Sequence, residues 1–462
     1  MSNTVQDVIS KGFCVGCGAC ASIQPNIENM TLNHLGQYEP KLQHLTSEAM
    51  DLADKICPFS DDSLNETQLG NKIFKNSENF DLRIGHYDSV HVGYAGEKNK
   101  YREEGSSGGL TNWLLAYLLK NKLIDGAIVV GSNDDRKANQ TIYSYQIIDN
   151  YNDLGSCAKS KYYPVELSQV VQLVKAQKRR FAFVGVPCYV KAIRNLCLSD
   201  SELDERIKFC ISIVCGHQKS ARYGEYLGAQ MGINHEDINL VDFRVKNKGQ
   251  PANRYATKLI ATDRVEQRDV FDLDGTDWGL GFFKYKACDY CDDVAGETAD
   301  ITLGDAWLPH EIKDWKGNNI VIVRNREIAE ILKKSSLSGE IQLRPSSAKE
   351  FQLSQIANYR HKVEGLSYRI INSRKAGEWV PQKRVSENEN QLNLTKRRMK
   401  ALDIRSILRD ESHIKYSACR GSGGVLKFKI QMLPMVIKYH FFAGSLTKYI
   451  VKGLMKINRK FF

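Results

Sequence analysis

Acidic residues are missing from the last part of the chain. No Asp or Glu occurs from His413 to Phe462, whereas Lys and Arg occur ten times there. The whole chain of 462 residues has 65 Lys and Arg against 54 Asp and Glu, so the residues before His413 are nearly neutral. The net charge of +11 therefore belongs to the C-terminal tail. Because the rest of the chain is neutral and no known nucleic-acid motif is present, the sequence does not indicate nucleic-acid binding.

Export signals and apolar runs long enough to span a bilayer are absent as well. The opening residues, Met1 to Asp7, lack the basic and apolar runs of an export signal, so we expect a cytoplasmic protein. Twelve cysteines in a reducing cytoplasm indicate metal or redox chemistry rather than a disulfide framework. In the tail, Lys438, His440 and Lys448 interrupt every apolar run before it reaches the ~18 residues that a membrane span needs.

Four of the cysteines form a pattern typical of iron–sulfur proteins. Cys14, Cys17 and Cys20 follow one another at two-residue gaps, and the more distant Cys57 precedes Pro58. Three thiolates on one short loop and a remote Cys-Pro pair are the ligands of a ferredoxin-type [4Fe-4S] cluster. Zinc sites more often use separated pairs of cysteines, and buried cysteines without a metal are a further alternative. The pattern predicts a first [4Fe-4S] cluster on these four residues.

Short apolar segments in the middle of the chain end in residues that can do chemistry. Three of them read as buried strands, at residues 180–185, 208–214 and 300–305. The residues at or just after their ends are Cys188, Cys215, His217 and Asp305. Strands that alternate with helices indicate an α/β sheet, and ligands bind such sheets beyond the carboxyl ends of the strands. We expect these residues to share one site, with Asp305 or His217 handling protons.

A second group of cysteines includes the pair Cys288 and Cys291, which have two residues between them. Together with Cys188 and Cys215 they would supply four thiolates for a second [4Fe-4S] cluster. The alternative is that Cys188 and Cys215 are ordinary buried cysteines, because cysteine is among the residues most often found in protein cores.

A glycine-rich loop precedes a predicted helix that starts at Leu110. The segment Gly105-Ser-Ser-Gly-Gly109 offers backbone N–H groups and two hydroxyls, which favour a phosphate or pyrophosphate, although an ordinary serine-rich helix cap looks the same. It matches neither a Walker loop nor a Gly-x-Gly-x-x-Gly fingerprint. Lys161, in a basic loop, would stabilise a reduced flavin ring if it lay beside one, and is otherwise a surface lysine.

Several of these motifs occur in an order that is typical of one family. They are Arg102 to Gly109, Ser160 to Tyr162, Gly185 to Cys188, Cys215 to His217, Phe243 to Lys246, Cys288 to Cys291 and Ala299 to Asp305. In this order they resemble the coenzyme F-420 hydrogenase/dehydrogenase beta-subunit family over roughly residues 85 to 340. The segment from Cys14 to Cys57 is similar to the ferredoxin-type module that many members carry in front.

The resemblance implies FAD together with iron–sulfur clusters. It makes Cys188, Cys215, Cys288 and Cys291 ligands of a second cluster, and it predicts flavin contacts at Ser106, Ser107, Gly108, Gly109 and Lys161. The implied activity passes electrons from a ferredoxin-like donor through the clusters to FAD and on to a small organic substrate. Similar bacterial proteins accompany surface-polysaccharide enzymes. A non-catalytic electron-transfer subunit of a larger complex is the alternative, and a zinc-stabilised binding module is a weaker one.

These patterns together predict a mixed α/β fold with four regions. They are a ferredoxin-like module at residues 1–75, a flavin-loop region at 85–165, a region with the second cluster at 166–345, and a helical linker with a basic amphipathic tail at 346–462. The lysines and apolar residues of the tail favour an anionic membrane surface, on which the tail would lie without crossing. The alternative is that its helices pack on the protein body, since core-facing helices show the same periodicity.

Overall fold

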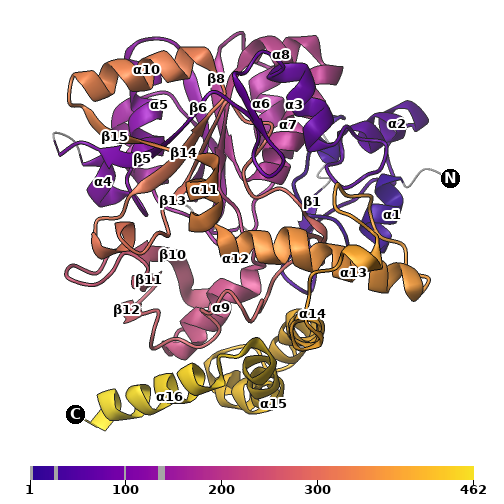
Figure 1. Cartoon of the computed structure of the whole chain (residues 1–462), viewed down its shortest axis with the longest axis vertical. Helices are drawn as coiled ribbons and strands as arrows, with labels where there is room; N and C mark the ends of the chain where they lie inside the picture. Colours follow the sequence, from indigo (N-terminus) through magenta and orange to yellow (C-terminus); the bar gives the residue numbers. More distant parts are fainter. Residues whose placement is uncertain (1–3, 25–29, 98–99, 134–140, 462) are drawn as a thin grey trace.

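The computed structural model describes residues 4–24, 30–97, 100–133 and 141–461. The molecule is organised around one mixed sheet of eight strands. Helices surround this sheet in Figure 1. In spatial order the strands are β15 (Ile341–Ser346), β5 (Ser89–Ala95), β14 (Asn319–Val323), β13 (Ile301–Asp305), β9 (Ile207–Ile213), β8 (Phe181–Gly185), β6 (Gly126–Ser132) and β7 (Tyr143–Ile148). The predicted α/β class is confirmed.

The centre of the sheet is parallel and its flanks are antiparallel. β6, β8, β9 and β13 all run in the same direction, whereas β7 on one side and β14, β5 and β15 on the other pair antiparallel with their neighbours. The carboxyl ends of the four parallel strands therefore meet at one edge. This is the edge at which the predicted site residues leave the sheet.

Helices cover both faces of the sheet, as alternate strand residues require. Phe181 and Phe183 point to the core that holds α6 (Ser168–Lys175) and α7 (Pro187–Ser199). Ala182 and Val184 point to the opposite core, which holds α5 (Leu110–Lys120) and α10 (Arg326–Leu337). A sheet buried on both faces explains why its strands read as continuous apolar runs in the sequence.

The N-terminal unit packs against one end of this body. It contains α1 (Val5–Ser10), the hairpin of β1 (Met30–Leu32) and β2 (Tyr38–Pro40), α2 (Ser47–Ile56) and α3 (Glu66–Ile73). Phe13, Val15 and Phe59 lie in the same apolar core as α6 and α7. The unit is thus continuous with the main core. The short pair β3 (Asn79–Asp81) and β4 (Gly85–Tyr87) follows it.

A second lobe lies beyond the carboxyl edge of the sheet. It contains α9 (Ala221–Gln230) and the antiparallel sheet of β10 (Ile238–Val245), β11 (Ala256–Ala261) and β12 (Val265–Asp269). Figure 1 shows α14 (Lys396–Ser417), α15 (Val425–Ala443) and α16 (Leu446–Phe461) at the lower end of the molecule, below this lobe. Among the described residues, no helix is both long and apolar enough to cross a membrane.

The polar residues before the tail, from Ala348 to Lys375, form helices that cross the middle of the molecule. They are α11 (Ala348–Ser354), α12 (Ile356–Tyr359), a π-helical turn at Arg360–Glu364 and α13 (Gly365–Lys375). The C-terminal region is therefore helical, as predicted. The eight-stranded sheet takes strands from both central regions, so the boundaries between the four predicted regions stay a prediction.

Candidate functional site

The first four cysteines line one cavity. Cys14, Cys17 and Cys20 lie on the loop after α1, and Cys57 caps the C-terminus of α2. The cavity has a volume of about 20 Å³ and is otherwise lined mainly by apolar residues such as Phe13. The loop needs glycine to turn the thiols inward. Gly16 has a φ of 67°, and a Cβ there would lie 2.7 Å from the Tyr38 carbonyl oxygen.

The environment of these thiols fits a cluster that binds thiolates. Burial raises the pKa of all four, to about 12 for Cys17, and charges on the neighbouring thiols add to the rise in Cys14, Cys17 and Cys20. The Gly16 N–H donates to Cys14 Sγ at 3.3 Å. Cluster binding would release these protons and satisfy four buried thiolates. Among the described residues, no group of three or more His, Cys, Asp or Glu side chains is placed to hold a metal ion, so the ligand assignment stays a prediction.

The second group of cysteines also comes together. Cys188 lies in the first turn of α7 after β8, Cys215 follows β9, and Cys288 and Cys291 lie in or beside the 3-10 turn at Lys286–Tyr290. Burial raises the pKa of Cys188, and so do the charges of Cys291, Cys215 and Cys288. The Gln218 N–H donates to Cys288 Sγ at 3.3 Å. Cys188 is thus near the other three cysteines of this group, and their role as ligands of a second cluster stays a prediction.

The two groups of cysteines lie next to each other. Cys17 is close enough that its charge also raises the pKa of Cys188. Tyr189 is buried near both, and its hydroxyl donates to the Val165 carbonyl oxygen at 2.6 Å. The same chain therefore places eight thiols in two adjacent sets of four.

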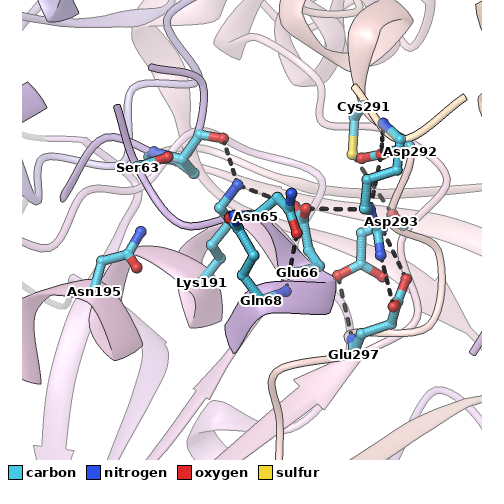
Figure 2. A network of polar contacts seen from close by, with 12 residues as sticks. Ser63, Asn65, Glu66, Gln68, Lys191, Asn195, Cys291, Asp292, Asp293 and Glu297 are labelled. Atoms are coloured by element: carbon cyan, nitrogen blue, oxygen red, sulfur yellow. Dashed lines mark hydrogen bonds and ion pairs between the residues drawn. The ribbon is translucent and has the colours of Figure 1, made fainter. Parts of the chain in front are cut away.

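A buried ionic network fixes the N-terminal unit to the body near both sets. Figure 2 shows Glu66 of α3, Lys191 of α7 and the residues that follow Cys291 in one group of contacts. Lys191 Nζ donates to the Pro58 carbonyl oxygen at 3.1 Å and pairs with Glu66 at 3.4 Å. The guanidinium of Arg384 contacts three buried carboxylates, those of Glu66, Asp292 and Glu297. These contacts hold the segments carrying Cys57, Cys188 and Cys291 in a fixed relation.

One part of the predicted flavin loop packs against the sheet, and the other part faces the predicted cofactor site. The Ser107 hydroxyl donates to the Asn318 carbonyl oxygen at 2.7 Å, and Gly108 accepts from the Ala95 N–H at 2.8 Å. Gly109, with a φ of 77°, caps α5, whose first N–H, that of Leu110, donates to Asn319 Oδ1 at 3.1 Å. Ser107, Gly108 and Gly109 therefore hold the loop against β5 and β14.

Ser106 and Lys161 lie on the other side of that loop, toward the second lobe. Ser106 Oγ accepts from the Ser160 N–H at 2.8 Å, which joins the two predicted flavin segments. Lys161 Nζ donates to the Ala158 carbonyl oxygen at 2.5 Å, and burial lowers its pKa. The Ser106 carbonyl oxygen accepts from Arg244 of β10 at 3.2 Å, so this side of the loop contacts the second lobe and not β5 and β14.

The two predicted proton-handling residues lie at opposite ends of a line of aromatic side chains. Asp305 makes a bidentate pair with Arg244, at 3.0 and 3.3 Å, and Arg244 also donates to the Tyr162 hydroxyl. Tyr162 contacts Trp278, whose ring centroid lies 4.2 Å from that of His217. Burial lowers the pKa of His217, so its ring is neutral, and its Nε2 has no hydrogen-bond partner among the described residues.

Several residues that shape this site carried little or no signal in the sequence. Lys246 Nζ donates to the Ser107 carbonyl oxygen at 2.9 Å, and burial together with the charges of Arg102 and Arg244 lowers its pKa to about 7. Arg244 and Lys246 belong to the motif Phe243 to Lys246, which does not by itself indicate a role for either residue. Lys362, which contacts Cys291 Sγ at 3.2 Å, lies in a polar stretch with no motif at all.

Two sequence models of one family match the middle of the chain. The model for the N-terminal part of the coenzyme F420 hydrogenase/dehydrogenase beta subunit matches residues 91–172, and the model for its C-terminal part matches residues 178–349. The matched residues include the second set of cysteines, the flavin loop, Lys161, His217 and Asp305.

Individual relatives agree with these matches. The chain is 23% identical over 378 residues to a coenzyme F420-dependent sulfite reductase of Methanocaldococcus jannaschii, covering 78% of this chain and 52% of the relative. It is 26% identical over 253 residues to the coenzyme F420 hydrogenase subunit beta of Methanococcus voltae, covering 51% of this chain and 80% of that one. The chain thus spans only about half the length of the sulfite reductase.

A solved structure is also similar. A chain of the F420-reducing [NiFe] hydrogenase complex from Methanosarcina barkeri aligns with a TM-score of 0.48 and 17% identity. The alignment covers 65% of this chain and 96% of that chain.

Proposed function

The chain belongs to the coenzyme F420 hydrogenase/dehydrogenase beta-subunit family, a family of redox proteins, and from this premise we propose that it is an iron–sulfur oxidoreductase that transfers electrons. The observation that carries the proposal is the arrangement of eight thiols in two adjacent sets of four. Clusters bound there would supply one-electron transfer. The first set would hold a cluster on Cys14, Cys17, Cys20 and Cys57, and the second on Cys188, Cys215, Cys288 and Cys291.

We further propose that the chain binds FAD beside the second set of cysteines. A flavin exchanges electrons singly with clusters and in pairs with organic molecules, which is why the two kinds of cofactor are combined. The aromatic line from Tyr162 to His217 offers flat apolar surfaces, and the buried Arg244 Nε has no partner among the described residues. Ser106 and Lys161 would contact the cofactor, while Ser107, Gly108 and Gly109 position the loop that carries Ser106.

The residues around this position also fit proton handling. Arg244 holds Asp305 in a bidentate ion pair, so Asp305 is a fixed hydrogen-bond acceptor, and the neutral His217 ring has an Nε2 without a partner among the described residues that is available for a hydrogen bond to a substrate. We propose these two residues as the groups that accompany electron transfer to a small organic substrate. The names of the two curated relatives make a deazaflavin of the coenzyme F420 type the first substrate to test.

The electron donor and the assembly state are part of the same proposal. A ferredoxin-like protein is the donor that suits the N-terminal unit, and the protein would work in the cytoplasm. Because one relative is a hydrogenase subunit, a role as an electron-transfer subunit inside a larger complex is the second candidate. None of the relatives described above is named for polysaccharide synthesis, so the proposed substrate class does not include sugars.

Anaerobic purification tests the cofactor content. We expect ~8 iron atoms per chain if both cysteine sets hold a [4Fe-4S] cluster, together with a bound yellow flavin that reduced ferredoxin bleaches. Reoxidation by the deazaflavin in the purified chain alone supports the enzyme, whereas reoxidation only after a partner protein is added supports the subunit. A colourless chain that contains zinc and no iron contradicts both.

Substitutions of single cysteines assign the iron to the two sets. We expect Cys57→Ser and Cys188→Ser each to lower the iron content from ~8 to ~4 atoms per chain, because each removes one ligand of one cluster. Cys419→Ser is the matched control, because Cys419 lies in the tail, where its thiol donates to the Lys415 carbonyl oxygen at 3.1 Å. An unchanged iron content in Cys188→Ser would show that Cys188 is not a ligand of the second cluster.

A further inference from the structure

Helix α15 has two apolar faces, and only one of them is covered. Phe428, Met432, Val436 and Tyr439 are buried in the core of the second lobe. Phe428 packs against the rings of Tyr226 of α9 and Tyr416 of α14. It also packs against the ring of Phe283, which lies in the loop between β12 and the 3-10 turn at Lys286–Tyr290. The tail is therefore fixed to the protein body along this face, as one of the two alternatives for the tail predicted.

The opposite face of α15 is exposed and apolar. Its residues recur at steps of three and four, which places them in one stripe along the helix. Helix α16 also carries exposed apolar residues, and every residue of the two helices' exposed apolar set is between 42% and 69% exposed. The surface comprises Leu426, Ile430, Leu433, Ile437 and Phe441 of α15, and Ile450, Val451, Leu454 and Met455 of α16.

The charged side chains of the tail itself are all basic. Lys427, Lys438 and Lys448 are exposed near the stripe, and no acidic residue follows Glu411 in the sequence. Two other lysines of the tail, Lys429 and Lys456, pair with Asp274 at 2.7 and 2.6 Å and so hold the tail on the body. An exposed apolar stripe with lysines at its side matches the chemistry of an anionic lipid surface, into which such a helix sinks with its axis parallel to the membrane plane.

We propose that the outward faces of α15 and α16 form a docking surface for the anionic face of a lipid bilayer. The bilayer would receive the apolar side chains between its headgroups, and its anionic lipids would attract the lysines. A second copy of the chain fits less well, because two such surfaces would bring lysines together with no acidic residue from the tail to pair with them. The proposal concerns where the protein works and goes beyond the proposed electron transfer.

Flotation with lipid vesicles tests this surface. The full chain, purified without oxygen, is mixed with vesicles of phosphatidylcholine alone or with about one third phosphatidylglycerol. We expect at least tenfold stronger partitioning to the anionic vesicles. The double variant Ile430→Asn/Ile437→Asn is expected to lose at least tenfold of this partitioning, because both side chains lie on the stripe.

Matched controls distinguish vesicle binding through this surface from binding through any exposed apolar side chain and from the effect of a folding defect. Leu82→Asn/Leu337→Asn removes two apolar side chains that are 88% and 82% exposed elsewhere on the molecule, and we expect it to bind vesicles like the natural chain. Lys427→Gln/Lys438→Gln is expected to reduce binding to anionic vesicles toward the phosphatidylcholine level without touching the apolar stripe. Circular dichroism and iron content of all variants should match the natural chain, since none of these residues lies at the cysteine sets.

Three results would overturn the proposal. The first is equal partitioning to neutral and anionic vesicles, and the second is no flotation of the natural chain with either. The third is an Ile430→Asn/Ile437→Asn variant that floats normally but has a smaller mass in sedimentation, since the surface would then be an interface between two copies.

Discussion

Replacing Asp289 with asparagine is expected to lower the free energy of unfolding by about 3–5 kcal/mol, because it leaves buried cations without their partner. Asp289 is 1% exposed and lies between Cys288 and Tyr290 in the loop of the second cysteine set. Its carboxylate pairs with Lys284 and Arg409, and with His361 at 2.9 Å. Burial alone would raise the pKa of Asp289, but Lys284 and Arg409 outweigh it and hold the pKa well below the usual range.

Without Asp289, Lys284 and Arg409 would have no partner of equal strength among the described residues. The only other carboxylate paired with Arg409 there is the half-exposed Asp410, and burial lowers the pKa of Lys284 to about 7 even with Asp289 present. Asparagine keeps the shape of the side chain but carries no charge, so packing is preserved while the desolvation of Lys284 and Arg409 is no longer offset. The loss therefore measures the electrostatic contribution rather than a cavity.

Urea unfolding of the anaerobically purified chain, followed by circular dichroism, measures the change. Glu202→Gln is the control, because Glu202 pairs with Arg206 at 3.0 Å but is 71% exposed, and we expect a loss below about 1 kcal/mol. Cys288→Ser, with Asp289 in place, shows how much of any loss comes from a missing cluster. The electrostatic explanation fails if the Asp289 variant is no less stable than the Cys288 variant.

The sequence predicted the convergence of the second cysteine set because that convergence follows from the sheet. Cys188 and Cys215 come directly after strands, and β8 and β9 are parallel neighbours, so their carboxyl ends must meet at one edge. Asp305 ends the next strand of the same parallel set. The short apolar runs that predict these strands are sufficient for this inference. The ligand roles themselves stay predictions.

The sequence could not predict the cations that surround the cysteines. Lys362 and Arg384 follow Cys291 by many residues, and they reach the site because the π-helical turn at Arg360–Glu364, α13 and the segment after it fold back across the body. Local patterns carry no information about such returns, since a lysine in a polar stretch usually faces solvent. The sequence of the tail is equally insufficient to predict its packing. Helix α15 is apolar on two faces, and periodicity alone does not indicate which face packs on the body and which stays exposed.

A loss of the positive charge at Lys362 should lower the reduction potential of a cluster held by the second cysteine set. Lys362 is 2% exposed, and its Nζ lies 3.2 Å from Cys291 Sγ and 2.6 Å from the Asp293 carbonyl oxygen. Burial would lower the pKa of this lysine, but the charges of Cys291, Cys215 and Cys288 outweigh it and raise the pKa above its ordinary value. The lysine is therefore charged and placed against the ligands.

The π-helical turn at Arg360–Glu364 explains how the lysine reaches this position. Both His361 and Lys362 of the turn are buried, and they contact Asp289 and Cys291 of the same loop. Such turns occur often at functional sites because the extra residue redirects side chains. A cluster becomes more negative on reduction, so a fixed cation beside a ligand stabilises its reduced state.

We expect Lys362→Met to shift the potential of the second cluster by about 60 to 130 mV to more negative values, which is what a charge-assisted hydrogen bond of ~1.5–3 kcal/mol corresponds to for one electron. A redox titration followed by electron paramagnetic resonance measures it, with the first cluster in the same sample as an internal reference. Lys362→Arg keeps the charge and should retain most of the potential.

Lys286→Met is the second control for this prediction. Lys286 lies two residues before Cys288, but its Nζ donates to the Lys11 carbonyl oxygen at 3.0 Å, on the outer side of the loop. Water screens a charge there, so its removal should shift the potential much less than removal of the buried charge. Equal shifts in the Lys286 and Lys362 variants would mean that the net charge of the protein alone sets the reduction potential. An unchanged potential in a Lys362→Met protein with ~8 iron atoms would show that Lys362 only supports the loop.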